Sequence, residues 1–380
     1  MIRVLEVVAS MNRGGVETTL MNILRTIDRE KVIMDFLVTT DEECDYYDEI
    51  RELGGLIYSV PNRRKGVFKN KKALDDFFRV HNEYKIVHMH GASLSYIEPL
   101  IAAKKNGVPV RIIHSRNTRQ NGSRVHVLLH FYHRLFIKNI ATHFFACSKL
   151  AADWMYGNKI QLDRWTMINN GIITDKFVFN QNKRDEIRKE LNINNDEYAI
   201  VNVGRLADQK NHLFLLKVFV GVLKRDSSAK LFLVGDGPNR VLIENFIREN
   251  GIEDSVSLLG VRSNIYDLLQ GMDLFFMPSL YEGLPGSVIE AQGSSLPCIL
   301  SDSITKEVAV TNLVEYLSLN DGIDMWVESI LKKKNYKRRN TKDEIVNAGF
   351  DMNTIAMKLE EFYIEEGNKH ANVQKKDRLS

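Results

Sequence analysis

Short apolar segments alternate with amphipathic segments of helical spacing in two separate stretches of this chain. In the first stretch, residues 2–10 predict a strand, the glycines of NRGG a turn, and residues 16–27 a helix. The alternation begins again with YAIVNVGRL at residue 198 and is more regular from there on. Because strands that alternate with helices form parallel sheets covered on both faces, we predict an α/β fold made of two doubly wound domains.

Changes in composition predict where these domains begin and end. The length of 380 residues suits two domains better than one core. A polar stretch without strand character separates the two alternating regions and looks like a linker with one helix. We expect an N-terminal domain over 1–177, a linker over 178–197, a C-terminal domain over 198–345, a helix over 346–366 and a disordered tail over 367–380.

Composition limits the class of protein. The chain is 44% hydrophobic and 27% charged, which is ordinary for a globular protein in water. Its three cysteines have no disulfide or metal spacing, so a reducing cytoplasm is the expected compartment. The first residues predict a strand rather than a signal peptide, and no apolar run is long enough for a transmembrane helix.

Two cations follow a predicted strand of the second domain. Arg205 and Lys210 come after VNVG, in the loop that opens the next helix. Ligands of open α/β sheets bind beyond the carboxyl ends of the strands, so these residues would lie at a cleft between the two domains. Arginine can bind a diphosphate through two hydrogen bonds and lysine as a point charge. The alternative is a pair of solvated loop cations.

Two glutamates flank a glycine-rich turn in YEGLPGSVIEAQ, residues 281–292. Glu282 comes directly after the predicted strand DLFFMPS, and Glu290 lies one turn into the following helix. Leu284 and Gly286 offer backbone N–H groups to an anion, and Glu290 suits the vicinal hydroxyls of a ribose. The alternative is that both glutamates are favourable charges in the first turn of a helix.

The combination of GRLADQKN, VGDGP, LLG and PSLYEGLPGSVIEAQGSSLPCILSD resembles the retaining glycosyltransferases of family 4. The resemblance extends to RGGVE, IIHS, ACSK and INNGIITDKF, and so covers about residues 1–310. Within the family the chain looks most like enzymes of bacterial capsule and exopolysaccharide assembly. The resemblance implies the GT-B fold, in which two Rossmann-like domains face each other across a cleft and a C-terminal helix crosses back to the first.

The resemblance also implies roles for the donor-side residues. Arg205 and Lys210 would neutralise the diphosphate of a nucleotide sugar, and Glu290 would hold its ribose. Glu282 would lie against the donor sugar, while the backbone of Leu284 and Gly286 contacts sugar or phosphate. Independently of the resemblance, Gly260 and Val261 lie at the end of the predicted strand VSLLG and could offer backbone groups to a nucleobase.

On the acceptor side, the resemblance places two features in the first domain. Gly14 and Gly15 would form the turn at which the acceptor approaches the diphosphate. His114 would touch the sugar and the reacting face. The alternative for His114 is a buried structural histidine that follows a strand.

The implied reaction is retaining sugar transfer from a UDP-sugar to a lipid-linked saccharide. GDP is the alternative base, and the sequence leaves open whether attack is same-face or passes through a covalent intermediate. The sequence contains no Asp-x-Asp, so neither a metal nor another cofactor is expected. Two alternative hypotheses are an epimerase of the same fold and a non-catalytic nucleotide-sugar-binding protein. No nucleic-acid motif is present, so nucleic acid is not an expected partner.

Positive charge is concentrated in the first domain. The interval between Glu98 and Asp153 holds nine lysines and arginines, five histidines and no acid. Residues 115–139 mix cations with aromatic residues at helical spacing, and residues 62–72 add a basic loop. We expect these segments to dock on an anionic membrane, which would place the protein at the inner face of the plasma membrane. The alternative is an amphipathic core helix with solvated cations.

Overall fold

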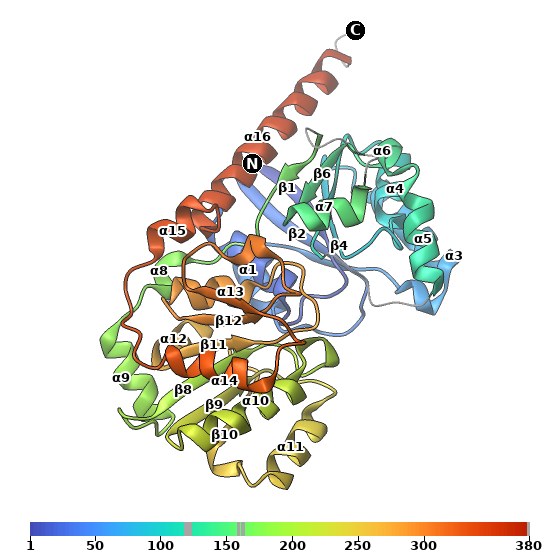
Figure 1. The fold of residues 1–380 in the computed structure, drawn as a ribbon. Coiled ribbons are helices and arrows are strands. Elements are labelled where there is room, and N and C mark those ends of the chain that lie inside the picture. Colours follow the sequence, from blue (N-terminus) through green and yellow to red (C-terminus); the bar gives the residue numbers. More distant parts are fainter. Residues whose placement is uncertain (118–123, 158–159, 161–163, 378–380) are drawn as a thin grey trace. The chain divides into compact units, whose positions relative to one another are not determined.

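The structure is a computed structural model that describes residues 1–117, 124–157, 160 and 164–377. It divides into two compact units (Figure 1). The first comprises Met1–Gly171 together with Met352–Ser380, and the second comprises Ile172–Asp351. Each unit has one parallel sheet, with seven strands in the first and six in the second. The predicted α/β fold of two doubly wound domains is therefore confirmed.

The sheet of the first unit has the strand order β3-β2-β1-β4-β5-β6-β7. Its strands are β1 (Ile2–Val7), β2 (Val32–Val38), β3 (Ile57–Ser59), β4 (Ile86–Gly91), β5 (Val110–Ser115), β6 (His143–Ala146) and β7 (Thr166–Met167). The helices of this part of the chain are α1 (Gly15–Thr26), α2 (Tyr47–Glu52), α3 (Val67–Val80), α4 (Glu98–Lys105), α5 (Arg124–Arg134), α6 (Ile137–Ile140) and α7 (Lys149–Tyr156), with a short 3₁₀ turn at Arg63–Lys65.

The sheet of the second unit has the strand order β10-β9-β8-β11-β12-β13. Its strands are β8 (Tyr198–Val203), β9 (Ala229–Val234), β10 (Val256–Gly260), β11 (Leu274–Met277), β12 (Cys298–Ser301) and β13 (Val314–Leu317). Its helices are α8 (Thr174–Phe177), α9 (Gln181–Glu190), α10 (His212–Arg225), α11 (Arg240–Glu249), α12 (Ile265–Gly271), α13 (Gly286–Gly293), α14 (Ile323–Lys332) and α15 (Lys342–Asn347). Three 3₁₀ turns, at Asp208–Lys210, Glu253–Ser255 and Lys306–Val308, complete this part.

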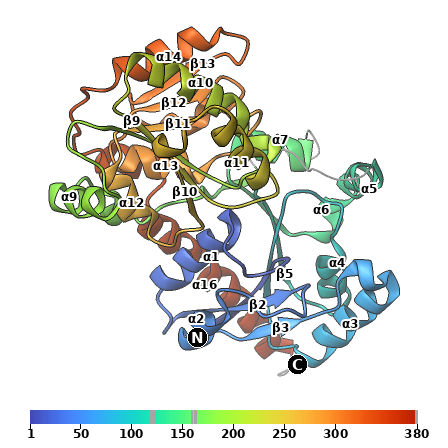
Figure 2. The same ribbon diagram turned by 90° about the horizontal axis from the view of Figure 1, so that it is seen from below.

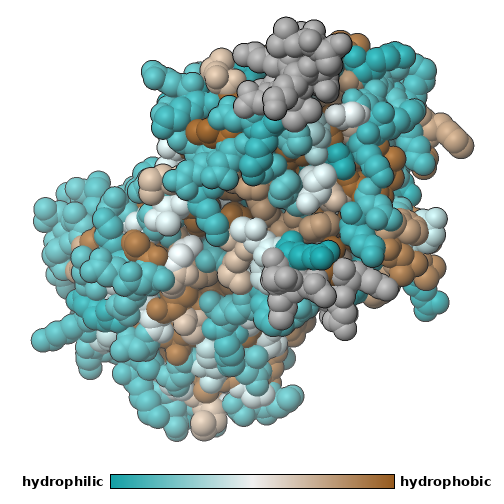
Figure 3. Space-filling model, turned by 90° about the horizontal axis from the view of Figure 1, so that it is seen from above, coloured by the Kyte–Doolittle hydropathy of each residue, from teal (hydrophilic) through white to brown (hydrophobic). Residues whose placement is uncertain are grey.

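Helices cover both faces of the second sheet, as Figures 1 and 2 show. One hydrophobic cluster joins the sheet to α10, α11 and α14, and a second joins it to α9, α12, α13 and α15. Strands buried on both faces need continuous apolar runs rather than alternation, which is what YAIVNV of β8 provides. The face in Figure 3 is mostly hydrophilic, with hydrophobic residues reaching the surface in smaller patches. In the described part of the chain, no helix combines the length and apolar character that a membrane span requires.

The last helix, α16 (Met352–Asp377), belongs to the first unit. Glu360 on α16 accepts a hydrogen bond from the backbone N–H of Asp28 at 3.0 Å and pairs with Lys31 at 3.0 Å. The tail expected to be disordered over 367–380 is helical as far as Asp377, so that expectation is wrong for most of the segment. This stretch contains no proline that would end a helix, and its first residue, Gly367, packs so closely on Ile2 that an added Cβ would lie 2.5 Å from it.

The second unit begins and ends at neighbouring residues. Ile172 and Asp351 form a parallel bridge, and the N–H of Ile172 donates to the carbonyl of Phe350 at 2.9 Å. The expected boundaries at 177 and 345 are therefore displaced, because α8 and α15 pack within this unit.

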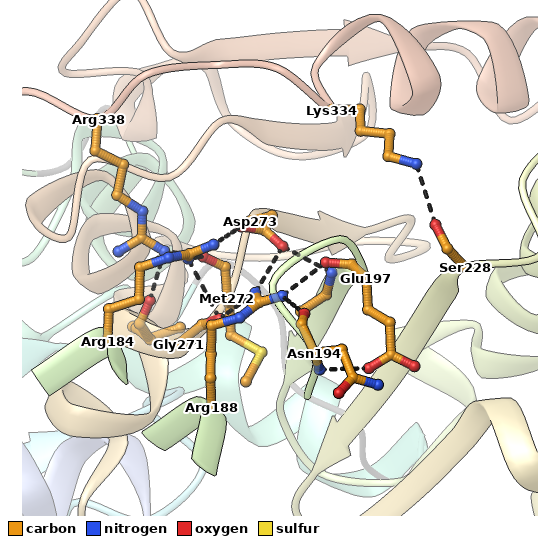
Figure 4. A network of polar contacts seen from close by, with 12 residues as sticks. Arg184, Arg188, Asn194, Glu197, Ser228, Gly271, Met272, Asp273, Lys334 and Arg338 are labelled. Atoms are coloured by element: carbon orange, nitrogen blue, oxygen red, sulfur yellow. Dashed lines mark hydrogen bonds and ion pairs between the residues drawn. The ribbon is translucent and has the colours of Figure 1, made fainter. Parts of the chain in front are cut away.

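The polar stretch 178–197 is not a free linker, because α9 is bound to the second unit (Figure 4). Arg184 and Arg188 of α9 both bind the carboxylate of Asp273, at 2.6 and 3.1 Å. Both also donate to the carbonyl of Gly271 at the end of α12. Arg338 adds hydrogen bonds to the carbonyls of Leu269 and Met272. Cations at the negative end of a helix are favourable, so Arg184 and Arg188 fasten α9 to the end of α12 and to Asp273.

Candidate active site

The candidate residues of the second unit lie on loops at the carboxyl edge of its sheet. β8 and β11 are neighbours, and the chain runs from β8 outward in both directions, so this is the point where the strand order reverses. Three hydrogen bonds join the loops that follow these strands: Leu280 N–H to Gln209 O at 2.8 Å, Gln209 Nε2 to Tyr281 O at 3.0 Å, and Asn211 Nδ2 to Pro278 O at 3.2 Å. The two loops therefore form one surface.

Lys210 and Glu282 meet on this surface, with 2.8 Å between Nζ and Oε1. Their side chains are only 13% and 9% exposed. The pair lacks hydrogen-bond geometry, and Glu282 Oε1 has no hydrogen-bond donor among the described residues. The backbone of Glu282 is fixed by a parallel bridge to Ile304. The two opposite charges are shielded from solvent and neutralise each other as an ion pair.

The stem of Lys210 crosses the backbone of Gly204. An added Cβ at Gly204 would lie 2.7 Å from Lys210 Cε. Two further glycines bring the β9 loop against the β8 loop, because added Cβ atoms at Gly235 and Gly237 would lie 2.1 and 2.4 Å from the carbonyls of Gly204 and Leu206. The glycines of VGDGP are therefore needed for close backbone approach.

Arg205, on the same loop as Lys210, is exposed. Its guanidinium makes no hydrogen bond and no ion pair with the described residues. Val261, on the loop after β10, is 60% exposed and follows Gly260, whose φ is +65°. The N–H of Gly235 donates to the carbonyl of Gly260 at 2.8 Å, which ties the β10 loop to the same edge.

Glu290 lies inside α13 rather than in its first turn, which contains no acidic residue. The alternative of a first-turn charge is therefore wrong for Glu290. Gly286 begins the helix, the N-cap Pro285 supplies no side-chain cap, and Leu284 before it is buried. The Glu290 carboxylate keeps some exposed surface but is surrounded by protein, and burial raises its pKa to about 7. None of the described cations or donors pairs with it.

The first unit contains the remaining candidates. Gly14 is the N-cap of α1, and an added Cβ there would lie 2.4 Å from Glu17 Oε2, whereas Gly15 has no atom within 4 Å of that position. His114 at the end of β5 is fully buried, which is the position that the structural alternative describes. Its Nδ1 lies 3.0 Å from His88 Nε2, its Nε2 has no hydrogen-bond partner, and burial holds its pKa well below the ordinary value.

Three buried histidines, His88, His90 and His114, have ring nitrogens within 4.8 Å of one another. Such a set suggests a metal centre, but both nitrogens of His90 are occupied. Its Nε2 contacts Glu6 Oε2 at 2.6 Å, and its Nδ1 accepts from Arg116 Nε at 3.1 Å. With no lone pair free on His90 and a guanidinium beside it, these residues do not fit a bound cation.

A cavity of 260 Å³ opens at the carboxyl ends of β1 and β4, where the strand order of the first sheet reverses. His90, Ser93 and Tyr96 contribute to its wall. His90 was not among the residues predicted from the sequence. The available signal was the spacing of HMHG in a predicted strand, since alternate residues of a strand point to the same face.

Comparisons with known proteins agree with these two units. The family described as Glycosyltransferase Family 4 matches residues 13–176, and that described as Glycosyl transferases group 1 matches residues 183–347. The chain is 36% identical over 361 residues to the putative glycosyltransferase EpsF of Bacillus subtilis, covering 92% of this chain and 93% of that protein.

Two further comparisons reach nearly the full length. The chain is 26% identical to the UDP-Gal:alpha-D-GlcNAc-diphosphoundecaprenol alpha-1,3-galactosyltransferase of Escherichia coli, covering 91% of this chain and 95% of that enzyme. Among solved structures, Anabaena Alr3699/HepE in complex with UDP and glucose superposes with a TM-score of 0.77 at 15% identity, covering 95% of this chain and 99% of that one.

Proposed function

This chain belongs to the group 1 and family 4 glycosyltransferases and has their GT-B fold, and we propose that it is a retaining, metal-independent sugar transferase. The donor is a nucleotide sugar with UDP as its nucleotide. The acceptor is a lipid-linked saccharide, and the product enters a capsule or exopolysaccharide. The arrangement of Lys210, Glu282, Arg205 and Glu290 on one sheet edge carries this proposal.

The charges of this edge suit a nucleotide diphosphate. Arg205 has no protein partner among the described residues, and Lys210 contacts the Glu282 carboxylate at 2.8 Å and, more weakly, Met277 Sδ at 3.9 Å. A diphosphate placed here meets two cations and the start of α13 at Gly286. Glu290, which no described cation neutralises, accepts the ribose hydroxyls, as the acidic residue of dinucleotide folds does. Val261 flanks the nucleobase.

The same groups account for the chemistry. As the sugar leaves, negative charge grows on the diphosphate, and preorganised cations stabilise that charge most strongly in the transition state. Glu282 positions the donor sugar, with Lys210 held between sugar and diphosphate. The acceptor hydroxyl attacks the face from which the diphosphate departs, and its proton goes to the departing phosphate oxygen. The absence of Asp-x-Asp from the sequence agrees with cations rather than a metal in this role.

The choice of donor and acceptor rests on relatives. The similar Escherichia coli enzyme is named for UDP-Gal and a diphosphoundecaprenol acceptor, and the HepE structure holds UDP. The similar CapH of Staphylococcus aureus is named for capsular polysaccharide biosynthesis. An epimerase or a binding protein of the same fold remains the rival, and each differs in a measurable way: an epimerase turns over its donor without an acceptor, and a binding protein releases no nucleotide.

The acceptor lipid implies a membrane surface, and α5 is suited to meet it. Four of its apolar side chains are exposed to solvent: Val125 (62%), Leu128 (70%), Phe131 (47%) and Tyr132 (58%). Of the described helix only His130 is buried, so α5 is not an amphipathic core helix. Exposed cations flank it at Arg124 and Lys138. Residues 118–123 of the basic segment lie outside the described residues. Apolar and basic groups together favour an anionic leaflet.

The test is transfer of a labelled sugar into lipid. The protein is incubated with radiolabelled UDP- and GDP-sugars and undecaprenyl-diphosphate-linked saccharides, and the extracted lipid is counted. We expect label from one UDP-sugar, with the anomeric configuration of the donor preserved in the NMR coupling constant of the product. Inverted configuration would contradict the retaining mechanism, and label from GDP-sugars alone would contradict the choice of UDP.

A further inference from the structure

A buried chain of polar contacts lies beneath the cavity of the first unit. Glu6 of β1 and His88 of β4 are neighbours in register, and both contact the hydroxyl of Tyr363 on α16. The Tyr363 hydroxyl lies 2.6 Å from His88 Nδ1 and donates to Glu6 Oε1 at 3.2 Å. The other oxygen of Glu6 contacts His90 Nε2 at 2.6 Å. All four side chains are nine-tenths or more buried.

The contacts of His90 assign its tautomer. Arg116 Nε can only donate, so His90 Nδ1 carries the lone pair and Nε2 carries the proton, which it donates to Glu6. Arg116 is itself anchored by a hydrogen bond of 2.7 Å to Asn170. His90 is therefore held between a carboxyl group and a guanidinium, with no nitrogen left to act as a base toward the cavity.

The cavity wall is neutral. No lysine, arginine, aspartate or glutamate is among the described residues that line it. The residues that line it include the hydroxyl-bearing Thr39, Ser93, Ser95 and Tyr96 and the aromatic His90. Three of these hydroxyls already donate within the protein, Thr39 to Ala9 O, Ser93 to Ser95 Oγ and Tyr96 to Asn70 Oδ1, so they can meet a ligand as hydrogen-bond acceptors. Hydroxyls beside ring faces suit an uncharged sugar, which has both hydroxyl and C–H surfaces. Since drug-sized ligands typically bind in pockets of about 300–1,000 Å³, a cavity of 260 Å³ suits one ring rather than an oligosaccharide.

We propose that this cavity receives an uncharged terminal sugar ring of the acceptor, and that Glu6 and Tyr363 are positioning residues which hold His90 in its wall. This rests on the proposed transferase function. The Tyr363 hydroxyl orients the Glu6 carboxyl group through its hydrogen bond, and Glu6 in turn orients the His90 ring. The orientation of this ring shapes the cavity wall that His90 lines. Because α16 supplies Tyr363, the seating of this helix and the acceptor cavity are linked through one hydroxyl.

The chain offers a matched control for Tyr363. The hydroxyl of Tyr84 also donates to a buried carboxylate of the same sheet, Asp35 Oδ2, at 2.8 Å. Asp35 and Tyr84 do not line the cavity. Tyr363→Phe and Tyr84→Phe thus remove the same group from similar surroundings, and only the first touches the chain of contacts to His90. Glu6→Gln serves as a second variant, since glutamine keeps the side-chain length and one acceptor oxygen.

The experiment measures acceptor-side binding directly, so that it does not depend on finding the natural acceptor. Full-length protein with saturating UDP is titrated with methyl N-acetyl-α-glucosaminide and with methyl α-glucuronide, and binding is followed by saturation-transfer NMR. We expect the neutral glycoside to bind, the glucuronide to bind at least about tenfold more weakly, and Tyr363→Phe and Glu6→Gln to weaken the neutral glycoside about tenfold. Tyr84→Phe should bind like the unaltered protein.

Other outcomes overturn the proposal. Equal binding of both glycosides, or no binding of the neutral one, contradicts an uncharged-sugar cavity. Unchanged binding in Tyr363→Phe, or equal weakening in Tyr84→Phe, contradicts a positioning role and leaves a structural one. Failure of the transferase function is a separate result, namely that no labelled lipid forms with any donor while these glycosides still bind.

Discussion

Lys210 and Glu282 lie 2.8 Å apart on two loops that only the parallel sheet brings together, 72 residues apart in the chain. The cation comes from the loop after β8 and the carboxylate from the loop after β11. Both side chains are largely buried, so the pair is shielded from screening by salt. A diphosphate bound here, as we propose, would compete with Glu282 for a cation that is already oriented.

Removal of the Lys210 charge should weaken nucleotide binding and slow transfer. We expect Lys210→Ala to lower kcat/KM by about 100- to 1,000-fold, because a preorganised charge at a leaving group contributes about 3–4 kcal/mol to the transition state. The check is initial-rate kinetics over a range of donor concentrations. Lys217→Ala, an exposed cation on the neighbouring α10, is the control and should leave the kinetics unchanged.

Glu290 should make stability depend on pH. Burial raises its pKa from 4.5 to about 7, so the folded chain holds this proton more tightly than the unfolded chain. The free energy of unfolding therefore falls as the pH rises from about 4.5 to 7 and is level above that. At pH 8, the free energy of unfolding of Glu290→Gln should exceed that of the unaltered protein by about 1–2 kcal/mol. This value is smaller than the full pKa shift would give, because the Glu290 side chain is partly exposed and water screens its charge.

Urea unfolding at pH 8 and pH 4.5 measures this difference, which should nearly vanish at the lower pH. Glu249→Gln, on the exposed face of α11, is the control and should show no such trend. The same Glu290→Gln variant should bind UDP more weakly. If Glu290→Gln were less stable than the unaltered protein at pH 8, burial could not be what raises the pKa of Glu290.

Asp273 should be essential for the attachment of α9. Asp273→Ala would leave Arg188, whose side chain is 4% exposed, without its carboxylate. Breaking a buried pair in this way typically costs about 3–5 kcal/mol. Thermal unfolding monitored by circular dichroism gives the loss. Asp324→Ala is the contrast, because its carboxylate is 87% exposed and its contact with Arg225 is 3.6 Å, so its removal should cost less than about 1 kcal/mol.

Gly237 should tolerate no side chain. An added Cβ would lie 2.4 Å from the carbonyl of Leu206, a backbone atom that cannot move aside without disturbing the β8 loop. We expect Gly237→Ala to destabilise the protein by roughly 2–3 kcal/mol and to weaken UDP binding, measured by chemical denaturation and titration calorimetry. Gly322→Ala, where no atom lies within 4 Å, should change stability by less than about 1 kcal/mol.

Charge reversal on α5 and beside it should weaken membrane binding. Arg124→Glu with Lys138→Glu should lower the affinity for vesicles that contain phosphatidylglycerol, by about 1 kcal/mol or more for each site. Sedimentation with vesicles is the measurement, and neutral phosphatidylcholine vesicles are the control. Equal sedimentation of variant and unaltered protein would contradict docking through this surface.

The alternation of short apolar segments with amphipathic ones made the sheets and most helices predictable. The spacing of apolar residues and the length of each segment distinguish a buried strand from an amphipathic helix. The role of residues 178–197 was not predictable. Their low hydrophobicity indicated a linker, and only the fold shows that Arg184 and Arg188 find Asp273, about ninety residues later. Helix α16 also ran further than the polar composition indicated, since polarity alone does not end a helix that has no breaker.

The candidate site was predictable where chemistry followed a strand end. Lys210, Glu282 and Glu290 could be chosen because parallel strands deliver their following residues to one edge. The pairing of Lys210 with Glu282 could not be foreseen, because it depends on the order β8-β11 in the sheet. The burial of His114 and the contacts of His90 with Glu6 and Arg116 depend likewise on which strands are neighbours.

Acceptor-dependent release of nucleotide from the donor distinguishes the proposed transferase from its alternatives. Free UDP is measured with UDP-sugars in the presence and absence of undecaprenyl-diphosphate-linked saccharide, for the unaltered protein, Lys210→Ala and Lys217→Ala. We expect release that requires acceptor, that is lost in Lys210→Ala and that is kept in Lys217→Ala. Release that continues without acceptor, or that Lys210→Ala retains in full, would contradict the proposed function.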